Sequence, residues 1–131
     1  MSTVLVVDDE YVICDILGFA LEDAGYRVEK ASNGEKALET LTAGLAAQPP
    51  GDARIELLIT DYMMPVMNGE ELARALRAEP SLQALPIILM SGAQASIGRE
   101  NPGLFDGVLD KPFDTELLIA MVQQLLPLPG E

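Results

Sequence analysis

Short apolar runs alternate with helical patterns along this chain, and this alternation constrains the fold more than any other feature of the sequence. Five runs read as strands, at Val4–Val7, Tyr26–Lys30, Ile55–Thr60, Pro86–Met90 and Gly107–Leu109. Strands that alternate with helices form a parallel sheet with right-handed crossovers. We therefore predict an α/β fold, a doubly wound parallel five-stranded sheet of (βα)5 type, in one domain over residues 1–131.

The segments between the strands carry helical spacing and helix caps. The first helix is indicated by Val12, Ile13, Ile16, Leu17, Ala20 and Leu21, and it ends near Gly25. The second is expected to turn Ala37, Leu38 and Leu41 inward. Capping boxes are predicted for Ser32 with Glu35 and for Asn68 with Glu71, and Asp114 or Thr115 can cap the last helix. Because Gln94–Asp106 contains two glycines and a proline, we expect a short or irregular fourth helix.

Charge and composition exclude several classes of function. The chain has 21 acidic and 8 basic side chains, a formal net charge of −13, and no histidine. A protein that binds nucleic acid through phosphates needs a basic patch, so we expect neither nucleic acid nor an anionic membrane as a partner. The absence of histidine excludes phosphohistidine and histidine-based catalysis in this chain. The single cysteine and the lack of a signal peptide or spanning segment favour the cytoplasm.

Polar side chains follow the predicted strands, each where a strand ends. They are Asp8 and Asp9 after the first, Asp61 after the third, Ser91 after the fourth and Lys111 after the fifth. Ligands of open parallel sheets bind outside the carboxyl ends of the strands. Any one of these residues is most often a cap, a turn former or a solvated charge. Together they predict a single site at one edge of the sheet.

The residue types in this set fit phosphoryl chemistry with a divalent cation. Three neighbouring carboxylates repel one another, and Mg²⁺ with its preference for oxygen ligands is the usual compensation. Asp9 and Asp61 can bind it directly, Asp8 directly or through water, and a backbone carbonyl just past Asp61 can add a ligand. Lys111 and Ser91 can contact phosphoryl oxygens, and phosphoryl transfer depends mainly on alignment and charge neutralisation.

In these residues the sequence resembles the receiver domain of two-component response regulators. The matching segments are VLVVDDE at residues 4–10, LLITDYMMPVMNG at 57–69, PIILMSG at 86–92 and DKPF at 110–113. The resemblance implies a stand-alone, chemotaxis-regulator-like receiver with the flavodoxin-like fold. It implies Asp61 as phosphoacceptor, Asp8, Asp9, Asp61 and the Met63 carbonyl as Mg²⁺ ligands, Ser91 as switch hydroxyl and Lys111 as its charge partner. It also implies a cis Lys111–Pro112 bond.

Several positions depart from the family pattern. Family members often have an aromatic residue three positions before the lysine, where this chain has Val108, and Tyr62 and Phe105 do not occupy that position. The loop around residues 46–54 is longer than is typical. Met63 and Ala93 flank the expected path of an attacking water, and neither side chain can orient it by a strong hydrogen bond. We therefore expect slow self-dephosphorylation.

The resemblance implies a switch and not an enzyme with a separate substrate. The phosphoryl donor would be a histidine kinase or histidine phosphotransfer protein, and the downstream effector and phosphorylation-dependent dimerisation are left open. A phosphorylation-independent adaptor on the same fold is the alternative. Val108 and the irregular fourth helix favour it, whereas the complete set of site residues opposes it: Asp8, Asp9, Asp61, Ser91 and Lys111. A Mg²⁺-dependent phosphohydrolase is disfavoured, because Met63 stands where such an enzyme needs a general acid and no cap domain is present.

Overall fold

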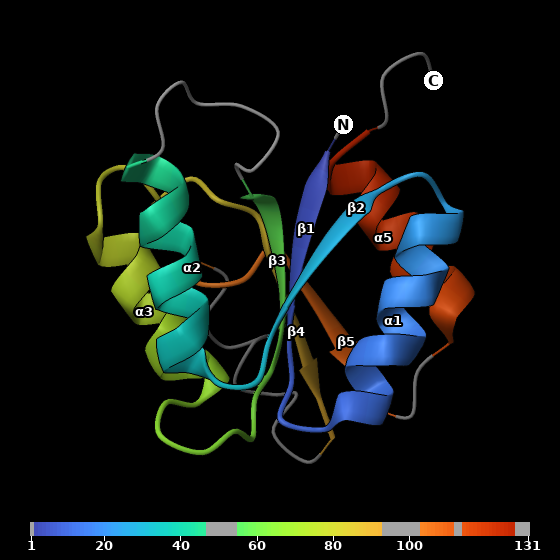
Figure 1. Ribbon diagram of the computed structural model, residues 1–131, viewed down its shortest axis with the longest axis horizontal. Coiled ribbons are helices and arrows are strands. Elements are labelled where there is room, and N and C mark those ends of the chain that lie inside the picture. Colours follow the sequence, from blue (N-terminus) through green and yellow to red (C-terminus); the bar gives the residue numbers. More distant parts are fainter. Residues whose placement is uncertain (1, 47–54, 93–102, 112–113, 128–131) are drawn as a thin grey trace.

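In a computed structural model that describes residues 2–46, 55–92, 103–111 and 114–127, five parallel strands form one sheet (Figure 1). Their order across the sheet is β2-β1-β3-β4-β5. Each begins or ends within one residue of its predicted bound: β1 Thr3–Val7, β2 Arg27–Ala31, β3 Ile55–Asp61, β4 Ile87–Ser91 and β5 Gly107–Asp110. The predicted α/β class and sheet are therefore confirmed.

Four helices in the described residues cover both faces of the sheet. Helices α1 and α5 lie on one face and α2 and α3 on the other (Figure 1). Their bounds are α1 Tyr11–Asp23, α2 Gly34–Ala46, α3 Gly69–Ala78 and α5 Thr115–Leu125. Most of the segment predicted to hold a fourth helix lies outside the described residues. Within the described ranges, none of the helices is long and apolar enough to cross a membrane.

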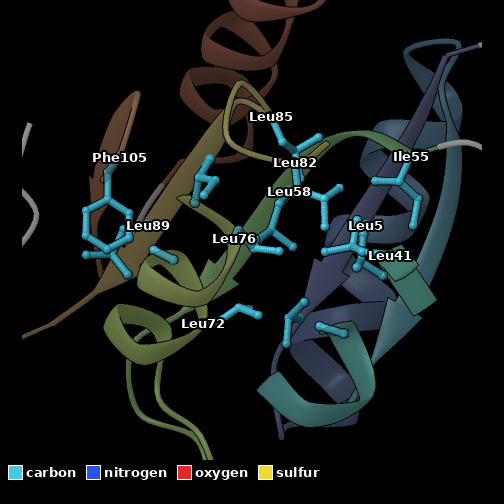
Figure 2. Close-up of a cluster of buried hydrophobic side chains, with 14 of the residues drawn as sticks. Leu5, Leu41, Ile55, Leu58, Leu72, Leu76, Leu82, Leu85, Leu89 and Phe105 are labelled. Atoms are coloured by element: carbon cyan, nitrogen blue, oxygen red, sulfur yellow. The ribbon is translucent and has the colours of Figure 1, made fainter. Parts of the chain in front are cut away.

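Successive side chains of a strand point to opposite faces of the sheet, so the core consists of two apolar clusters, one on each face. Leu5 and Val7 of β1 face the cluster beneath α2 and α3, whereas Val4 and Val6 face the cluster beneath α1 and α5. Figure 2 shows the first cluster, where Leu72 and Leu76 of α3 meet the sheet. All five β1 residues are buried, as expected of a central strand covered on both faces.

Helix α1 buries only part of its apolar pattern, with Leu17 and Leu21 inside and other apolar residues exposed. The buried residues are Cys14, Leu17, Gly18 and Leu21, which share one face at helical spacing. Val12 and Ile16 are instead exposed, at 67% and 48%. Because α1 is apolar on more than one side, the periodicity alone leaves the buried face ambiguous. The inward placement of Ala37 and Leu41 on α2 is confirmed.

The helix caps confirm two predictions and correct a third. Asn68 and Glu71 form a reciprocal capping box at the start of α3, and the Asp114 carboxylate accepts a hydrogen bond from the Glu116 amide. Ser32 was predicted to cap α2, but the side chain of Asn33 accepts from the Lys36 amide at 2.8 Å. The helix begins one residue later than predicted because the Asn33 carboxamide reaches the amide three residues on.

Candidate functional site

The polar residues predicted at the strand ends gather at the carboxyl edge of the sheet. Asp8 directly follows β1, Asp61 ends β3, Ser91 ends β4 and Lys111 follows β5. Since β3 pairs with β4 and β4 with β5, the last three lie on neighbouring strands. Asp8, Asp61 and Ser91 are buried, with exposed fractions of 1%, 5% and 1%. Buried carboxylates are uncommon unless they are paired, so we expect Asp8 and Asp61 to have charged or hydrogen-bonding partners.

Lys111 joins the two buried carboxylates. Its Nζ lies 3.0 Å from Oδ1 of Asp61 and 3.6 Å from Oδ2 of Asp8. The Lys111 backbone amide donates to the carbonyl of Ser91 at 2.9 Å, which fixes the start of its side chain beside β4. The side chain is about a quarter exposed, at 26%, so the ammonium is partly shielded from water. An ion pair held this way is stronger than one on the open surface.

Backbone amides hold both carboxylates in place. Oδ1 of Asp61 accepts from the Tyr62 amide at 3.0 Å, and Oδ1 of Asp8 accepts from the Glu10 amide at 2.9 Å. Each of these hydrogen bonds comes from the loop that leaves the strand, so the turn itself orients the acidic group. The loop conformation after β1 and after β3 therefore sets the geometry of the site.

The loop between β3 and α3 is tightly folded against the strand end. The Gly69 amide donates to the Tyr62 carbonyl at 2.9 Å, and a Cβ added at Gly69 would lie 2.6 Å from the Asp61 carbonyl oxygen. Only glycine permits this approach of α3. In the same loop Val66 has a φ of 73°, a left-handed conformation that is costly for a β-branched residue.

Burial raises the pKa of both buried carboxylates at this edge of the sheet. Burial raises the pKa of Asp8 to about 6, and the nearby charge of Asp61 adds to this against the effect of the Glu10 amide and Lys111. Burial also raises the pKa of Asp61, although Lys111 acts in the opposite direction. Burial lowers the pKa of the Lys111 amine, but its hydrogen bond to Asp61 and the two carboxylate charges outweigh this and raise it.

The acidic groups at this edge fit a hard divalent cation. Carboxylate oxygens of Asp8, Asp9 and Glu10 lie within 4.8 Å of one another. Oδ2 of Asp8 is buried and accepts no hydrogen bond among the described residues, and the Lys111 ammonium at 3.6 Å is its ion-pair partner. A cation could therefore bind this oxygen directly. Glu10 was not among the predicted site residues, although the run of three acidic residues after β1 was the available signal.

The structure describes two of the remaining predicted site residues, Asp9 and Met63, and does not describe two others. Asp9 is exposed next to the buried Asp8 and contributes to the field that raises the pKa of Asp61. Met63 is 63% exposed on the loop after Asp61. Ala93, which we expected to flank the path of water, and Pro112 of the predicted cis bond lie outside the described residues.

The position of the expected aromatic switch residue belongs to the core beneath α2 and α3. Val108 is half-buried and packs against that cluster, as does Tyr62, and Phe105 is buried within it. Both aromatic residues lie in the same cluster as Val108 without taking its place. Val108, which replaces the aromatic residue of the family pattern, therefore packs against the core.

A doubly wound α/β sheet with buried aspartates and a lysine at its carboxyl edge defines a class of phosphoryl-accepting signalling domain. The family model of the response regulator receiver domain matches residues 4–123, and the chain belongs to this family. It is therefore a two-component receiver, a signalling domain and not a conventional enzyme.

Individual relatives support the same assignment. A protein named as a probable transcriptional regulatory protein in Picosynechococcus sp. is 38% identical over 95% of this chain and 49% of its own length. The phosphate regulon transcriptional regulatory protein PhoB of Pseudomonas aeruginosa is 31% identical over 98% of this chain and 53% of its own length. The chain thus spans about half the length of these relatives. The crystal structure of chemotaxis protein CheY4 of Vibrio cholerae superimposes with a TM-score of 0.77, at 32% identity, over 96% of this chain and 99% of that one.

Proposed function

We propose that Asp61 is the phosphoacceptor and that Lys111 is its charge partner. The observation that carries this proposal is the 3.0 Å contact between the Lys111 ammonium and Oδ1 of the buried Asp61. Oδ1 is also held by the Tyr62 amide, so we assign Oδ2 as the attacking oxygen. A carboxylate that is oriented by its own loop and paired with a lysine needs little reorganisation to react.

We further propose that the site binds Mg²⁺ through Asp8, Asp9, Asp61 and the backbone carbonyl of Met63. Oδ2 of Asp8 supports this assignment, because it is buried, accepts no hydrogen bond among the described residues and has only the Lys111 ammonium at 3.6 Å beside it. When bound, the ion would neutralise charge on the oxygens of the transferring phosphoryl group. Its charge would also oppose the effect of the burial that raises the pKa values of Asp8 and Asp61, and so favour the ionised form of the nucleophile.

The donor is proposed to be the phosphohistidine of a histidine kinase or histidine phosphotransfer protein. Oδ2 of Asp61 forms the new bond to phosphorus as the phosphorus–nitrogen bond breaks, and the electron pair returns to the imidazole. Lys111 pairs with a phosphoryl oxygen in the product, which relieves the charge that the transfer adds next to Asp8. The Ser91 hydroxyl, on the strand between those of Asp61 and Lys111, is proposed to donate a hydrogen bond to another phosphoryl oxygen.

Phosphorylation is proposed to shift an existing equilibrium between conformations and so change the binding of a downstream effector. The effector is a separate partner or another part of a longer protein, and phosphorylation-dependent dimerisation is one form that this output can take. With 21 acidic side chains against 8 basic ones, this domain is proposed to contact neither nucleic acid nor membrane itself. It is proposed to act in the cytoplasm.

Intact-mass measurement after incubation with acetyl phosphate and Mg²⁺ tests the proposal. We expect one added phosphoryl group on the wild type, none after chelation of the metal, and none on Asp61→Asn. Asp110→Asn is the matched control, because Asp110 is an exposed aspartate at the end of β5, the second strand along the sheet from β3. Phosphorylation of Asp61→Asn to the wild-type extent would rule out Asp61 as the acceptor.

The alternative is a phosphorylation-independent adaptor that retains the receiver fold. It is favoured by Val108, which packs against the core in place of the aromatic residue typical of the family. The same experiment separates the two, because an adaptor would bind Mg²⁺ without gaining a phosphoryl group.

A further inference from the structure

One arginine at the edge of the sheet opposite the phosphoacceptor holds two segments of chain together. The guanidinium of Arg77, in the last turn of α3, donates to the carbonyls of Gln83 at 2.8 Å, Leu85 at 2.6 Å and Leu104 at 2.9 Å. It also donates to Oδ2 of Asp106 at 3.1 Å. The Arg77 side chain is only 18% exposed. One side chain therefore joins the connection before β4 to the residues just before β5.

Strand β5 depends on anchors at its two ends. It has only four residues and pairs with β4 alone in the described part of the sheet. At its start, the Asp106 amide donates to the Ile87 carbonyl, and Oδ2 of Asp106 accepts from the Ile87 amide, both at 2.8 Å. At its end, the Lys111 amide donates to the Ser91 carbonyl. The register of a short edge strand is weakly specified by its own ladder, so these end contacts matter.

Helix α3 connects this anchor to the phosphoacceptor. Its first residue, Gly69, donates to the Tyr62 carbonyl and lies against the Asp61 backbone, as described above. Its last turn carries Arg77. Because α3 is one continuous helix of ten residues, it links the loop beside Asp61 directly to Arg77. The sequence of contacts then runs from Asp61 through α3 to Arg77, through β5 to Lys111, and back to Asp61.

We propose that Arg77 is a positioning residue for phosphoryl transfer. By holding Asp106 at the start of β5, it sets how far β5 extends along β4 and hence where the Lys111 ammonium meets Asp61. The distance from Asp106 to Lys111 along the extended strand is about 17 Å, from a rise of about 3.3 Å per residue. The inference rests on the proposed role of Asp61 as the acceptor and adds to it a residue far from the reacting atoms.

The chemistry of arginine suits this role. Its planar guanidinium offers several N–H donors in a rigid fork, so it can serve three carbonyls and a carboxylate at once. A lysine at the same position has a flexible stem and a point charge, and it cannot reproduce this geometry. The Arg77→Lys variant therefore keeps the charge but releases most of the contacts. Because the variant also keeps most of the aliphatic stem, we expect it to fold.

The test is a double-mutant cycle on the rate of phosphorylation by acetyl phosphate at saturating Mg²⁺. We expect Arg77→Lys to slow the reaction on the order of tenfold, because a small displacement of Lys111 weakens its contact with the reacting group. In a Lys111→Ala background the same change should have no further effect. Asp106→Asn should lie between wild type and Arg77→Lys. Arg74→Lys, on the same helix but exposed, is the matched control and should react at the wild-type rate.

Amide hydrogen exchange gives a second readout that needs no phosphorylation. Arg77→Lys should speed hydrogen exchange at the Asp106 and Lys111 amides. The exchange rate of the Tyr62 amide, which follows β3, should not change. If Arg77→Lys speeds amide exchange as expected but the wild type gains no phosphoryl group, the proposed function is wrong and the structural role of Arg77 is unaffected. A wild-type rate in Arg77→Lys, or an equal loss with and without Lys111, would overturn the positioning role.

Discussion

The ammonium of Lys111 lies 3.0 Å from Oδ1 of Asp61 and 3.6 Å from Oδ2 of Asp8, although the three residues follow three different strands. Neither carboxylate could stay ionised at low energetic cost without this partner, because both are buried. We therefore expect the contact to stabilise the folded protein as well as to serve the proposed chemistry. It joins the ends of the first, third and fifth strands at the edge where we propose that the phosphoryl group is accepted.

Removal of the lysine should destabilise the metal-free protein. We expect Lys111→Met to lower the free energy of unfolding at neutral pH by about 2 kcal/mol, because two buried carboxylates lose their counter-charge. The measurement is urea denaturation in the presence of a chelator. Lys30→Met is the matched control, since Lys30 forms an exposed ion pair with Asp15 at 3.1 Å and should contribute little. Equal losses in both variants would contradict the account.

Metal-free stability should fall as the pH rises through the pKa of Asp8. The folded-state pKa is raised from 3.8 to about 6, so the folded protein binds more protons than the unfolded chain between these values. This contribution, on the order of 2 to 3 kcal/mol, is fully present below pH 3.8 and is lost as the pH rises through about 6. The raised pKa of Asp61 acts in the same direction. Chemical denaturation across this range checks the sign.

Substitution of Asp8 separates the pH effect from other acid-induced changes. Asp8→Asn should be more stable than wild type at neutral pH without metal, because a buried charge is removed and Oδ1 can still accept from the Glu10 amide. It should also bind Mg²⁺ more weakly. Asp9→Asn, at an exposed position, should weaken Mg²⁺ binding with little gain in stability. A loss of stability in Asp8→Asn would contradict the assignment of a raised pKa.

The left-handed conformation of Val66 should be a source of strain that substitution can relieve. Val66 has a φ of 73° and is 73% exposed, so little side-chain packing offsets the cost. We expect Val66→Asn to raise the free energy of unfolding by about 1 kcal/mol, because asparagine adopts this region more readily. Thermal denaturation provides the measurement. Val66→Ile keeps the β-branch and should bring no gain, and a gain there would point to a cause other than strain.

A polar side chain at Met63 should shorten the lifetime of the phosphorylated protein. Met63 is 63% exposed, two residues beyond Asp61, and its thioether cannot orient a water molecule by a strong hydrogen bond. We expect Met63→Asn to dephosphorylate faster than wild type, while Met63→Leu should not. Decay of the intact-mass adduct after removal of the donor gives the rate. An unchanged lifetime in Met63→Asn would contradict the role of this position.

Much of the fold could be predicted because strand signals in this chain are local. Continuous apolar runs identify β1, β3 and β4, and their abrupt ends at Asp8, Asp61 and Ser91 also identify the site edge. The buried face of α1 could not be predicted, because apolar residues occupy two of its faces and only packing against the sheet selects one. The cap of α2 was missed for a similar reason, since Ser32 and Asn33 are both good capping residues.

The contacts between distant parts of the chain were not predictable from spacing. Arg77 is one of eight scattered basic residues in the sequence, and nothing local connects it with Asp106 or with the carbonyl of Leu104. Likewise, Asp8 is buried and Asp9 is exposed because of the backbone conformation of the loop after β1, which residue spacing does not predict. The sequence indicates which residues lie at the site. Which of them are buried, and so have raised pKa values, follows only from the structure.

The identity of the phosphoacceptor is tested most directly by chemical mapping of the phosphorylated site. Borohydride reduction of the acetyl-phosphate-treated protein converts an aspartyl phosphate to homoserine, which peptide mass spectrometry then locates. The account predicts homoserine at position 61 and at no other aspartate, and only when Mg²⁺ was present. Homoserine at Asp8 or Asp9, or a phosphoryl group on Ser91 that resists reduction, would contradict it.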